Sequence, residues 1–206
     1  MIAIIHYGLG NVTAIANVYK RLGIEAKIAE TSEDLAQASR LILPGVGAFD
    51  HALDLFSSSG MRNKVEDLVM DKRIPVLGIC VGMQIMAERS EEGRTKGLGW
   101  IEGEVVHMRA VAGKNELILP HMGWNDVISR PDEPLFDGLP AGNARFYFLH
   151  SFVLSCRKDR NVMAEADYGG RFVCAVHADN VVGVQFHPEK SHHSGVRLLE
   201  NFGRMS

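Results

Sequence analysis

The stretch that organises the rest of the chain runs from Pro75 to Arg89 and reads Pro-Val-Leu-Gly-Ile-Cys-Val-Gly-Met-Gln-Ile-Met-Ala-Glu-Arg. Its beginning, residues 74–79, is a short apolar run of the kind found in fully buried parallel strands. The residues that follow predict a helix as far as Arg89. Between the two, Gly78-Ile-Cys80-Val-Gly82 has the Gly-x-nucleophile-x-Gly spacing of a sharp strand-to-helix turn. The sequence therefore predicts an elbow that presents the Cys80 thiol.

The two glycines of this elbow have a steric role. Backbone packs against backbone on both sides of so sharp a turn, and we expect a Cβ at Gly78 or Gly82 to collide with a neighbouring strand or helix. The free amides and the dipole at the start of the helix favour the thiolate form of Cys80. An unpaired cysteine is more often a small buried hydrophobic residue, so a catalytic interpretation also requires a histidine base and a group that orients it.

The composition indicates one globular domain over residues 1–206. A chain of 206 residues can bury a single α/β core, and its 46% hydrophobic and 23% charged residues are ordinary for such a protein. The net charge of -3 gives no electrostatic reason to expect a nucleic acid partner. The 3 cysteines are an odd number without CxxC spacing, which argues for a reducing compartment and against a disulfide framework or a zinc site.

The sequence contains no apolar run near the roughly 18 residues that span a bilayer. The apolar start, residues 1–6, is too short for a signal peptide and has no basic region before it. We therefore expect a soluble cytoplasmic protein with no membrane partner.

The first half of the chain alternates strand patterns with helix patterns. Such alternation predicts a largely parallel sheet covered on both faces, with its ligand site at the carboxyl edge of the strands. The predicted strands before the elbow cover residues 2–7, 25–29 and 40–43, and the predicted helices cover 12–22 and begin near 31 and 61.

The loop that follows the third predicted strand is Pro44-Gly-Val-Gly-Ala-Phe49. Glycines at the carboxyl end of a strand allow backbone amides to face a ligand without side chains in the way. An ordinary turn is the alternative. With Cys80 on a nearby strand, we favour a loop that contributes to an oxyanion hole.

From Gly97 onward the pattern changes to short strands separated by turns. Asp179-Asn180 is typical of a hairpin turn between strands at 172–177 and 181–186. Two clusters, Pro120–Asn125 and Tyr147–Phe152, are rich in aromatic and histidine residues, and each is as well explained by a loop packed on its own aromatics as by a site. Further strands are predicted at residues 102–108, 117–119, 145–149 and 161–166.

The base and the orienting group are found in Gly183-Val-Gln-Phe-His187-Pro-Glu189. If Pro188 keeps the backbone extended, His187 and Glu189 point to the same face, where the carboxylate can fix the imidazole tautomer. This predicts a Cys80-His187-Glu189 triad in the order nucleophile, base, orienter. His192 and His193 follow, but no third ligand does, so we predict neither a metal site nor a cofactor.

These blocks resemble those of the class I (triad) glutamine amidotransferases, almost from end to end. The elbow and the block 183–189 identify the class. Within it, the chain is most similar to the glutaminase subunits of imidazole glycerol phosphate synthase. That finer resemblance rests on Pro44–Phe49, on Met83 where the anthranilate and GMP enzymes usually carry histidine, on Pro120–Asn125 and on His187–Ser191. Two positions depart from the pattern: His6 is often aspartate, and Phe152 is often tyrosine.

The resemblance implies a fold, a reaction and a partner. The fold is an open, doubly wound, mostly parallel α/β sheet of flavodoxin-like type with added antiparallel strands in the second half. The reaction is hydrolysis of L-glutamine to glutamate and ammonia, which a (β/α)8-barrel cyclase subunit in a heterodimer then uses to make imidazole glycerol phosphate and AICAR. The implied residues are Val81, Val46 and Gly47 for the oxyanion hole; Gly47, Gly82, Gln84, Ser151 and Phe152 for the substrate; and His121, Met122, Trp124 and Lys190 for the partner interface.

Three alternatives remain open at this point. The chain could serve a different synthase as a paralogue. A stand-alone cysteine hydrolase explains the elbow but not the distant block around His187. A silent regulatory subunit is disfavoured by the intact Cys80, His187 and Glu189.

Overall fold

The computed structural model describes residues 1–112, 117–140 and 144–205. Its centre is a sheet whose first five strands are parallel, in the order β2-β1-β3-β4-β12. This is the strand order of a doubly wound flavodoxin-like sheet. The five strands are β1 (Ile2–Ile5), β2 (Ala26–Ala29), β3 (Arg40–Gly45), β4 (Val76–Cys80) and β12 (Val181–Val184).

The second half of the chain extends this sheet with antiparallel strands, which confirms the predicted fold class. The nine-stranded sheet continues from β12 through β11 (Arg171–Ala178), β10 (Val162–Asp167), β7 (His121–Ser129) and β8 (Ala144–His150). A separate sheet of three strands contains β5 (Arg89–Ser90), β6 (Gly103–His107) and β9 (Phe152–Cys156). The predicted hairpin is present: β11 pairs antiparallel with β12 around Asp179, whose φ is 54°.

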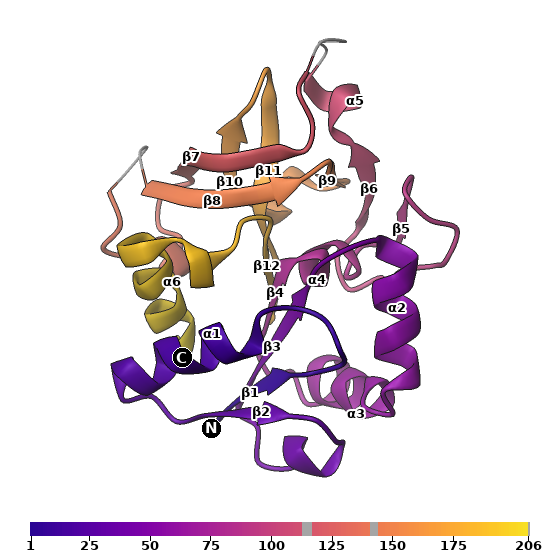
Figure 1. Cartoon of the computed structure of the whole chain (residues 1–206), viewed down its shortest axis with the longest axis vertical. Coiled ribbons are helices and arrows are strands. Elements are labelled where there is room, and N and C mark those ends of the chain that lie inside the picture. The colour runs from indigo at the N-terminus through magenta and orange to yellow at the C-terminus, as the bar shows by residue number, and fades with distance from the viewer. Residues whose placement is uncertain (113–116, 141–143, 206) are drawn as a thin grey trace.

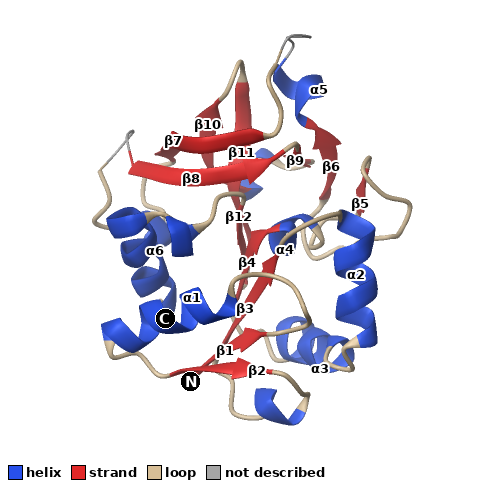
Figure 2. Cartoon of the chain, viewed as in Figure 1, coloured by secondary structure: helices blue, strands red, loops and turns tan. Residues whose placement is uncertain are grey.

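Helices cover both faces of the parallel strands, as Figures 1 and 2 show. On one side lie α1 (Val12–Leu22) and α6 (His192–Arg204), which contact each other, and on the other side lie α2 (Phe49–Ser58) and α3 (Arg62–Glu66). Helix α1 ends where predicted, because Gly23 adopts the left-handed conformation (φ 68°) of a helix C-cap. The remaining elements are α4 (Val81–Gln84), α5 (Met108–Ala112), a π turn at Asp67–Asp71, and 3-10 turns at Glu33–Leu35, Pro134–Phe136, Asp159–Asn161 and Pro188–Lys190.

The helix predicted to run from the elbow to Arg89 is wrong in length, since α4 ends at Gln84. The carbonyls that a longer helix would use internally accept hydrogen bonds from another segment. Leu98 donates to Ile85 (2.8 Å), and the amides of Gly99 and Ile101 donate to Ala87 and Met86. Residues 97–101 therefore satisfy this backbone in place of a helix.

Other expectations were also incomplete. The helix expected after Thr31 is only the 3-10 turn at Glu33–Leu35, and residues 117–119 form no strand, with Ile118 80% exposed. Helix α2 was not predicted. The two aromatic clusters are not self-packed loops, because their main parts form the antiparallel pair β7 and β8, in which His121 lies opposite His150.

No helix in the described part of the chain is long and apolar enough to cross a membrane.

Candidate active site

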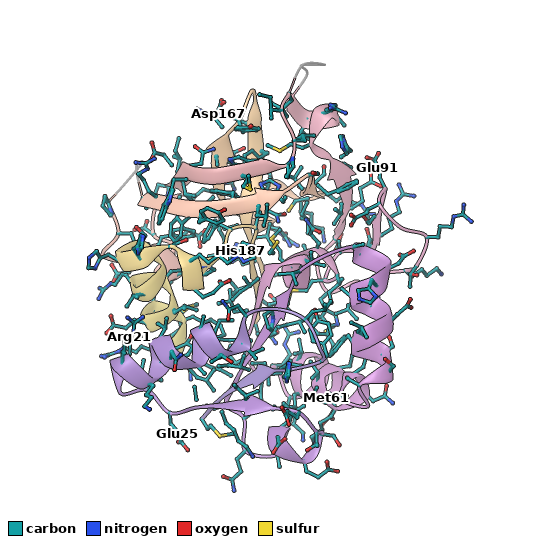
Figure 3. All side chains as sticks on the ribbon, viewed as in Figure 1. Arg21, Glu25, Met61, Glu91, Asp167 and His187 are labelled. Atoms are coloured by element: carbon teal, nitrogen blue, oxygen red, sulfur yellow. The ribbon has the colours of Figure 1, made fainter. Side chains whose placement is uncertain are left out.

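The carboxyl ends of three neighbouring parallel strands converge on one cavity of about 290 Å³. Strand β3 ends in the loop at Gly45, β4 ends at Cys80, and the segment after β12 carries His187, which lies near the middle of the molecule (Figure 3). This is the edge at which doubly wound sheets bind ligands. The cavity is lined by Val46, Gly47, Cys80, Val81, Gln84, Glu92, Pro120, Leu149, His150, Ser151, Phe152 and His187.

The backbone at Cys80 has the strained conformation of a nucleophile elbow, with φ 55° and ψ -114°. The predicted steric role of the glycines is confirmed. A Cβ on Gly78 would lie 2.8 Å from the backbone of Met83 in α4, and one on Gly82 would overlap the carbonyl of Leu43 in β3. Close packing of strand on helix therefore holds the thiol at the cavity wall.

His187 and Glu189 lie together, but not by the route expected from the sequence. Residues 188–190 form a 3-10 turn rather than an extended segment, and this turn brings Glu189 Oε1 to 3.0 Å from His187 Nδ1. Both side chains are only 3% exposed. The second carboxylate oxygen, Oε2, is buried and has no hydrogen-bond partner within the described residues.

The surroundings of His187 favour its protonated form. Burial lowers the pKa of this imidazole, but the hydrogen bonds and negative charges of Cys80 and Glu189 outweigh burial and raise the pKa to about 10. An imidazolium is therefore available next to the thiol at neutral pH. An imidazolium in this position favours the thiolate form of a cysteine and supplies a proton donor.

Two further groups approach the Cys80 sulfur. The side-chain amide of Gln185 donates to Sγ at 3.7 Å, and the Leu149 carbonyl lies 3.9 Å from Sγ. The helix dipole expected to favour the thiolate is weak, because α4 has only 4 residues. Side chains therefore contribute more to the electrostatics at Sγ than the sequence suggested.

Comparison with known proteins identifies the family. The family model described as "Glutamine amidotransferase class-I" matches residues 3–205. The chain belongs to this family. The chain is 51% identical over 205 residues to "Imidazole glycerol phosphate synthase subunit HisH" of Leptospira interrogans, covering 100% of both chains. A protein of the same name from Bdellovibrio bacteriovorus is 53% identical, again over 100% of both chains.

Solved structures bear on the fold alone. The crystal structure of a glutamine amidotransferase superposes with a TM-score of 0.74 at 22% identity, covering 98% of each chain. The structure of PurLQS from Thermotoga maritima gives a TM-score of 0.72 at 17% identity. The doubly wound sheet with antiparallel additions is therefore the family fold.

Most of the residues expected to bind substrate line the cavity of this chain. Gln84 is fixed by two hydrogen bonds, from its Nε2 to the Phe152 carbonyl (3.0 Å) and to Gln185 Oε1 (3.1 Å). The exception is Gly82, which packs against β3 and does not line the cavity, so its contribution is to the elbow. In the candidate oxyanion loop, Gly47 has a φ of 89° that only glycine adopts readily.

The residues expected at a partner interface divide into two groups. Met122 (65% exposed) and Trp124 (40%) point outward from β7, and Lys190 is exposed, with its ammonium 5.8 Å from the centroid of the Tyr147 ring. His121 is only 3% exposed, so its side chain lies behind this surface rather than on it. Side chains alternate along a strand, so His121 faces inward because Met122 faces outward.

Sequence reasoning assigned no role to Gln185 or to His150. Gln185 lies inside the block that was recognised for His187, and its contact with Cys80 depends on how β12 is placed beside β4. His150 lies at the end of β8, and its partner His121 is distant in sequence. The available signal was a polar residue next to apolar ones: Gln185 stands between Val184 and Phe186, and His150 follows Leu149. Among the residues that the structure describes, no group of three His, Cys, Asp or Glu is placed to hold a metal ion.

Proposed function

We propose that the chain is the glutaminase subunit of imidazole glycerol phosphate synthase and that it hydrolyses L-glutamine and passes the ammonia to a cyclase subunit. The observation that carries this proposal is a cysteine elbow beside a His187-Glu189 pair, in a chain that matches proteins of that name over their whole length. The cavity of about 290 Å³ has a volume suited to a small substrate.

In the first step the Cys80 thiolate attacks the carboxamide carbon of glutamine, forming a carbon–sulfur bond and a tetrahedral oxyanion. Donors to this oxyanion are the Val81 amide, which follows the nucleophile, and an amide of the Val46–Gly47 loop, which lines the same cavity. Pre-aligned backbone donors stabilise the negative charge where it develops.

In the following steps His187 moves protons. The imidazolium donates a proton to the departing nitrogen, so ammonia leaves and a glutamyl thioester remains. The neutral imidazole then removes a proton from water, which attacks the thioester and releases glutamate with the thiolate restored. Glu189 stabilises the imidazolium form in both half-reactions through the 3.0 Å contact.

Gln84, Ser151 and Phe152 are proposed to hold the amino-acid end of glutamine. Both amide protons of Gln84 are already donated to protein groups, so its carbonyl oxygen is the part left to accept a bond from a substrate ammonium. Ser151 offers a hydroxyl on the same wall of the cavity.

The partner surface is proposed to include Met122, Trp124 and Lys190. Exposed Met and Trp side chains on a paired strand are the residue types enriched in protein interfaces. The proposed partner is a (β/α)8-barrel cyclase that forms a heterodimer with this chain, takes up the ammonia before water protonates it, and works with it in the cytoplasm.

Steady-state glutamate release tests the function. It is measured for the chain alone, with the cyclase, and with the cyclase plus its ribonucleotide, beside a Cys80→Ala control. We expect release that rises with the cyclase and is absent from the control. Full activity of the chain alone would indicate a stand-alone hydrolase. No activity in any mixture would indicate a silent subunit, and activation only by another synthase would indicate a paralogue. Each of these outcomes contradicts the proposal.

A further inference from the structure

A chain of hydrogen bonds runs from strand β7, where it is exposed, into the buried interior and ends at the thiol. It begins at Asn125, whose Nδ2 donates to the Asp167 carbonyl (2.8 Å) and contacts Nε2 of His121 (3.3 Å). Since a carbonyl only accepts, the first bond fixes which end of the Asn125 side chain is nitrogen. Asn125 therefore donates to His121.

The two histidines that follow have fixed tautomers. His150 Nδ1 lies 3.0 Å from the Phe152 carbonyl and must donate to it, so Nε2 of the neutral ring accepts from His121 Nδ1, 3.0 Å away. His121 Nε2 is then the acceptor that Asn125 requires. Both rings stay neutral, because burial lowers the pKa of His121 to about 4, and burial together with the neighbouring histidine lowers that of His150 to about 3.

The same carbonyl orients the other half of the chain. Phe152 O also accepts from Gln84 Nε2, which donates its second proton to Gln185 Oε1. The Gln185 amide nitrogen is thereby turned toward Cys80 Sγ, at 3.7 Å. Reversing Asn125 or Gln84 would place two acceptors face to face, and reversing Gln185 would place its amide nitrogen against that of Gln84.

We infer that Gln185 is a further catalytic residue, which donates a hydrogen bond to the Cys80 thiolate, and that the Gln84–Phe152–His150–His121 chain positions its amide for this contact. The inference deepens the proposed function and rests on it for the reaction that the thiolate performs. Gln185 is 0% exposed. Burying an amide there is costly unless its donors are used, and an apolar side chain would fill the same space without that cost.

Stabilisation by Gln185 also compensates for the shortness of α4. A donor to a charged acceptor stabilises that charged form, so the thiolate gains relative to the thiol. The other titratable groups around Sγ are His187 with Glu189, then Tyr7, His150 and Glu92 from the surrounding elements. All of them remain when Gln185 is replaced, so a change in thiol reactivity isolates the amide.

The test is the pH dependence of Cys80 alkylation by iodoacetamide in the full chain, with the modified peptide quantified by mass spectrometry. Gln185→Met removes the donor and keeps an unbranched side chain of similar length. We expect its alkylation midpoint to rise by about one pH unit, so that alkylation is roughly tenfold slower below both midpoints. Gln185→Leu also removes the donor and adds no charge, and we expect a rise in the same direction if the methionine variant does not fold.

The matched control is Asn201→Leu, which removes a half-buried amide that donates to the carbonyls of Leu135 and Asp137 away from the cavity. Its midpoint should equal that of the wild type. Midpoints of folded Gln185 variants that do not differ from this control would overturn the inference. Glutamate release by the wild-type complex is measured in parallel. If the complex releases glutamate but the Gln185 variants show no midpoint shift, only the inference is refuted. If the variants show the shift but the complex releases no glutamate, only the proposed function is refuted.

Discussion

Two buried histidine sites lie within one molecule and have opposite charge states. At the carboxyl edge of the parallel strands, His187 has a pKa raised to about 10, whereas His150 on the antiparallel pair β7–β8 has one lowered to about 3. Both rings are nearly inaccessible to solvent. Burial acts in the same direction on both, so the difference comes from their partners.

The partners differ in charge. His187 faces a carboxylate and a thiol, which stabilise its proton, while His150 faces another histidine and a backbone carbonyl. The parallel edge is therefore suited to reactions that develop and move charge, and the antiparallel pair to a neutral network that fixes positions. Substitutions in the first region should affect activity much more than stability, and substitutions in the second should affect the pH dependence of stability.

The largest effect is expected from Cys80→Ala. Loss of the nucleophile should reduce glutamate release by roughly 10⁶-fold, the scale found when a triad nucleophile is removed. The circular dichroism spectrum and the affinity for the cyclase should stay near those of the wild type. Alanine is smaller than cysteine, so it fits the buried position and adds no strain to the elbow backbone. Near-normal release by the variant would make Cys80 a structural residue.

Glu189→Gln should reduce kcat less than His187→Ala, because the imidazole is still present and is only oriented less well by an uncharged amide. We expect a loss of about 10⁴-fold in kcat for the glutamine variant and more for the alanine variant. Removing the carboxylate charge also lowers the pKa of the His187 imidazolium, so the alkaline limb of kcat/KM should move to lower pH. Equal losses in both variants, or an unmoved alkaline limb, would remove Glu189 from the role given to it.

A smaller loss at the parallel edge is expected from Gly47→Ala. The φ of 89° at this position disfavours a side chain, so the loop amide should be displaced from the oxyanion. The expected reduction in kcat is about 10²- to 10³-fold, the value of one oxyanion donor. Lys72→Ala, at an exposed residue remote from the cavity, is the control. A Gly47 variant as active as this control would exclude the loop from the oxyanion hole.

The smallest effect is expected from His121→Phe, which keeps the stacking on Phe148 and Tyr168. The folded pKa of His121 lies below that of the unfolded chain, so between about pH 4 and 6.5 only the unfolded state binds this proton, and stability falls as the pH falls. Removing the group should reduce the slope of the unfolding free energy by up to about 1.4 kcal/mol per pH unit in that window. Urea unfolding across the window measures it, with His51→Phe on the exposed side of α2 as the control. An unchanged slope for His121→Phe would mean that the ring is protonated in the fold.

The two regions also differ in how much the sequence could predict about them. Strands β1, β3 and β4 and the elbow were predictable because short apolar runs and glycine spacing are local signals. Helix α4 was predicted too long because the bonds from residues 98–101 that replace its later turns come from a distant segment. The sequence placed His121 near a partner interface and gave Gln185 no role, because the contacts that each makes are formed only by strand pairing.

The identity of the nucleophile is tested most directly with 6-diazo-5-oxo-L-norleucine, an electrophilic analogue of glutamine. The His187 imidazolium supplies the proton that the diazo carbon of this compound must take up, and the thiolate then displaces dinitrogen and forms a stable carbon–sulfur bond. The complex is treated with it, glutamate release is followed, and the modified peptide is identified by mass spectrometry. We expect one adduct per chain, on Cys80, formed in step with the loss of release and prevented by excess glutamine. Loss of release with the adduct on another residue, or undiminished release from chains labelled at Cys80, would contradict the assignment of Cys80 as the nucleophile.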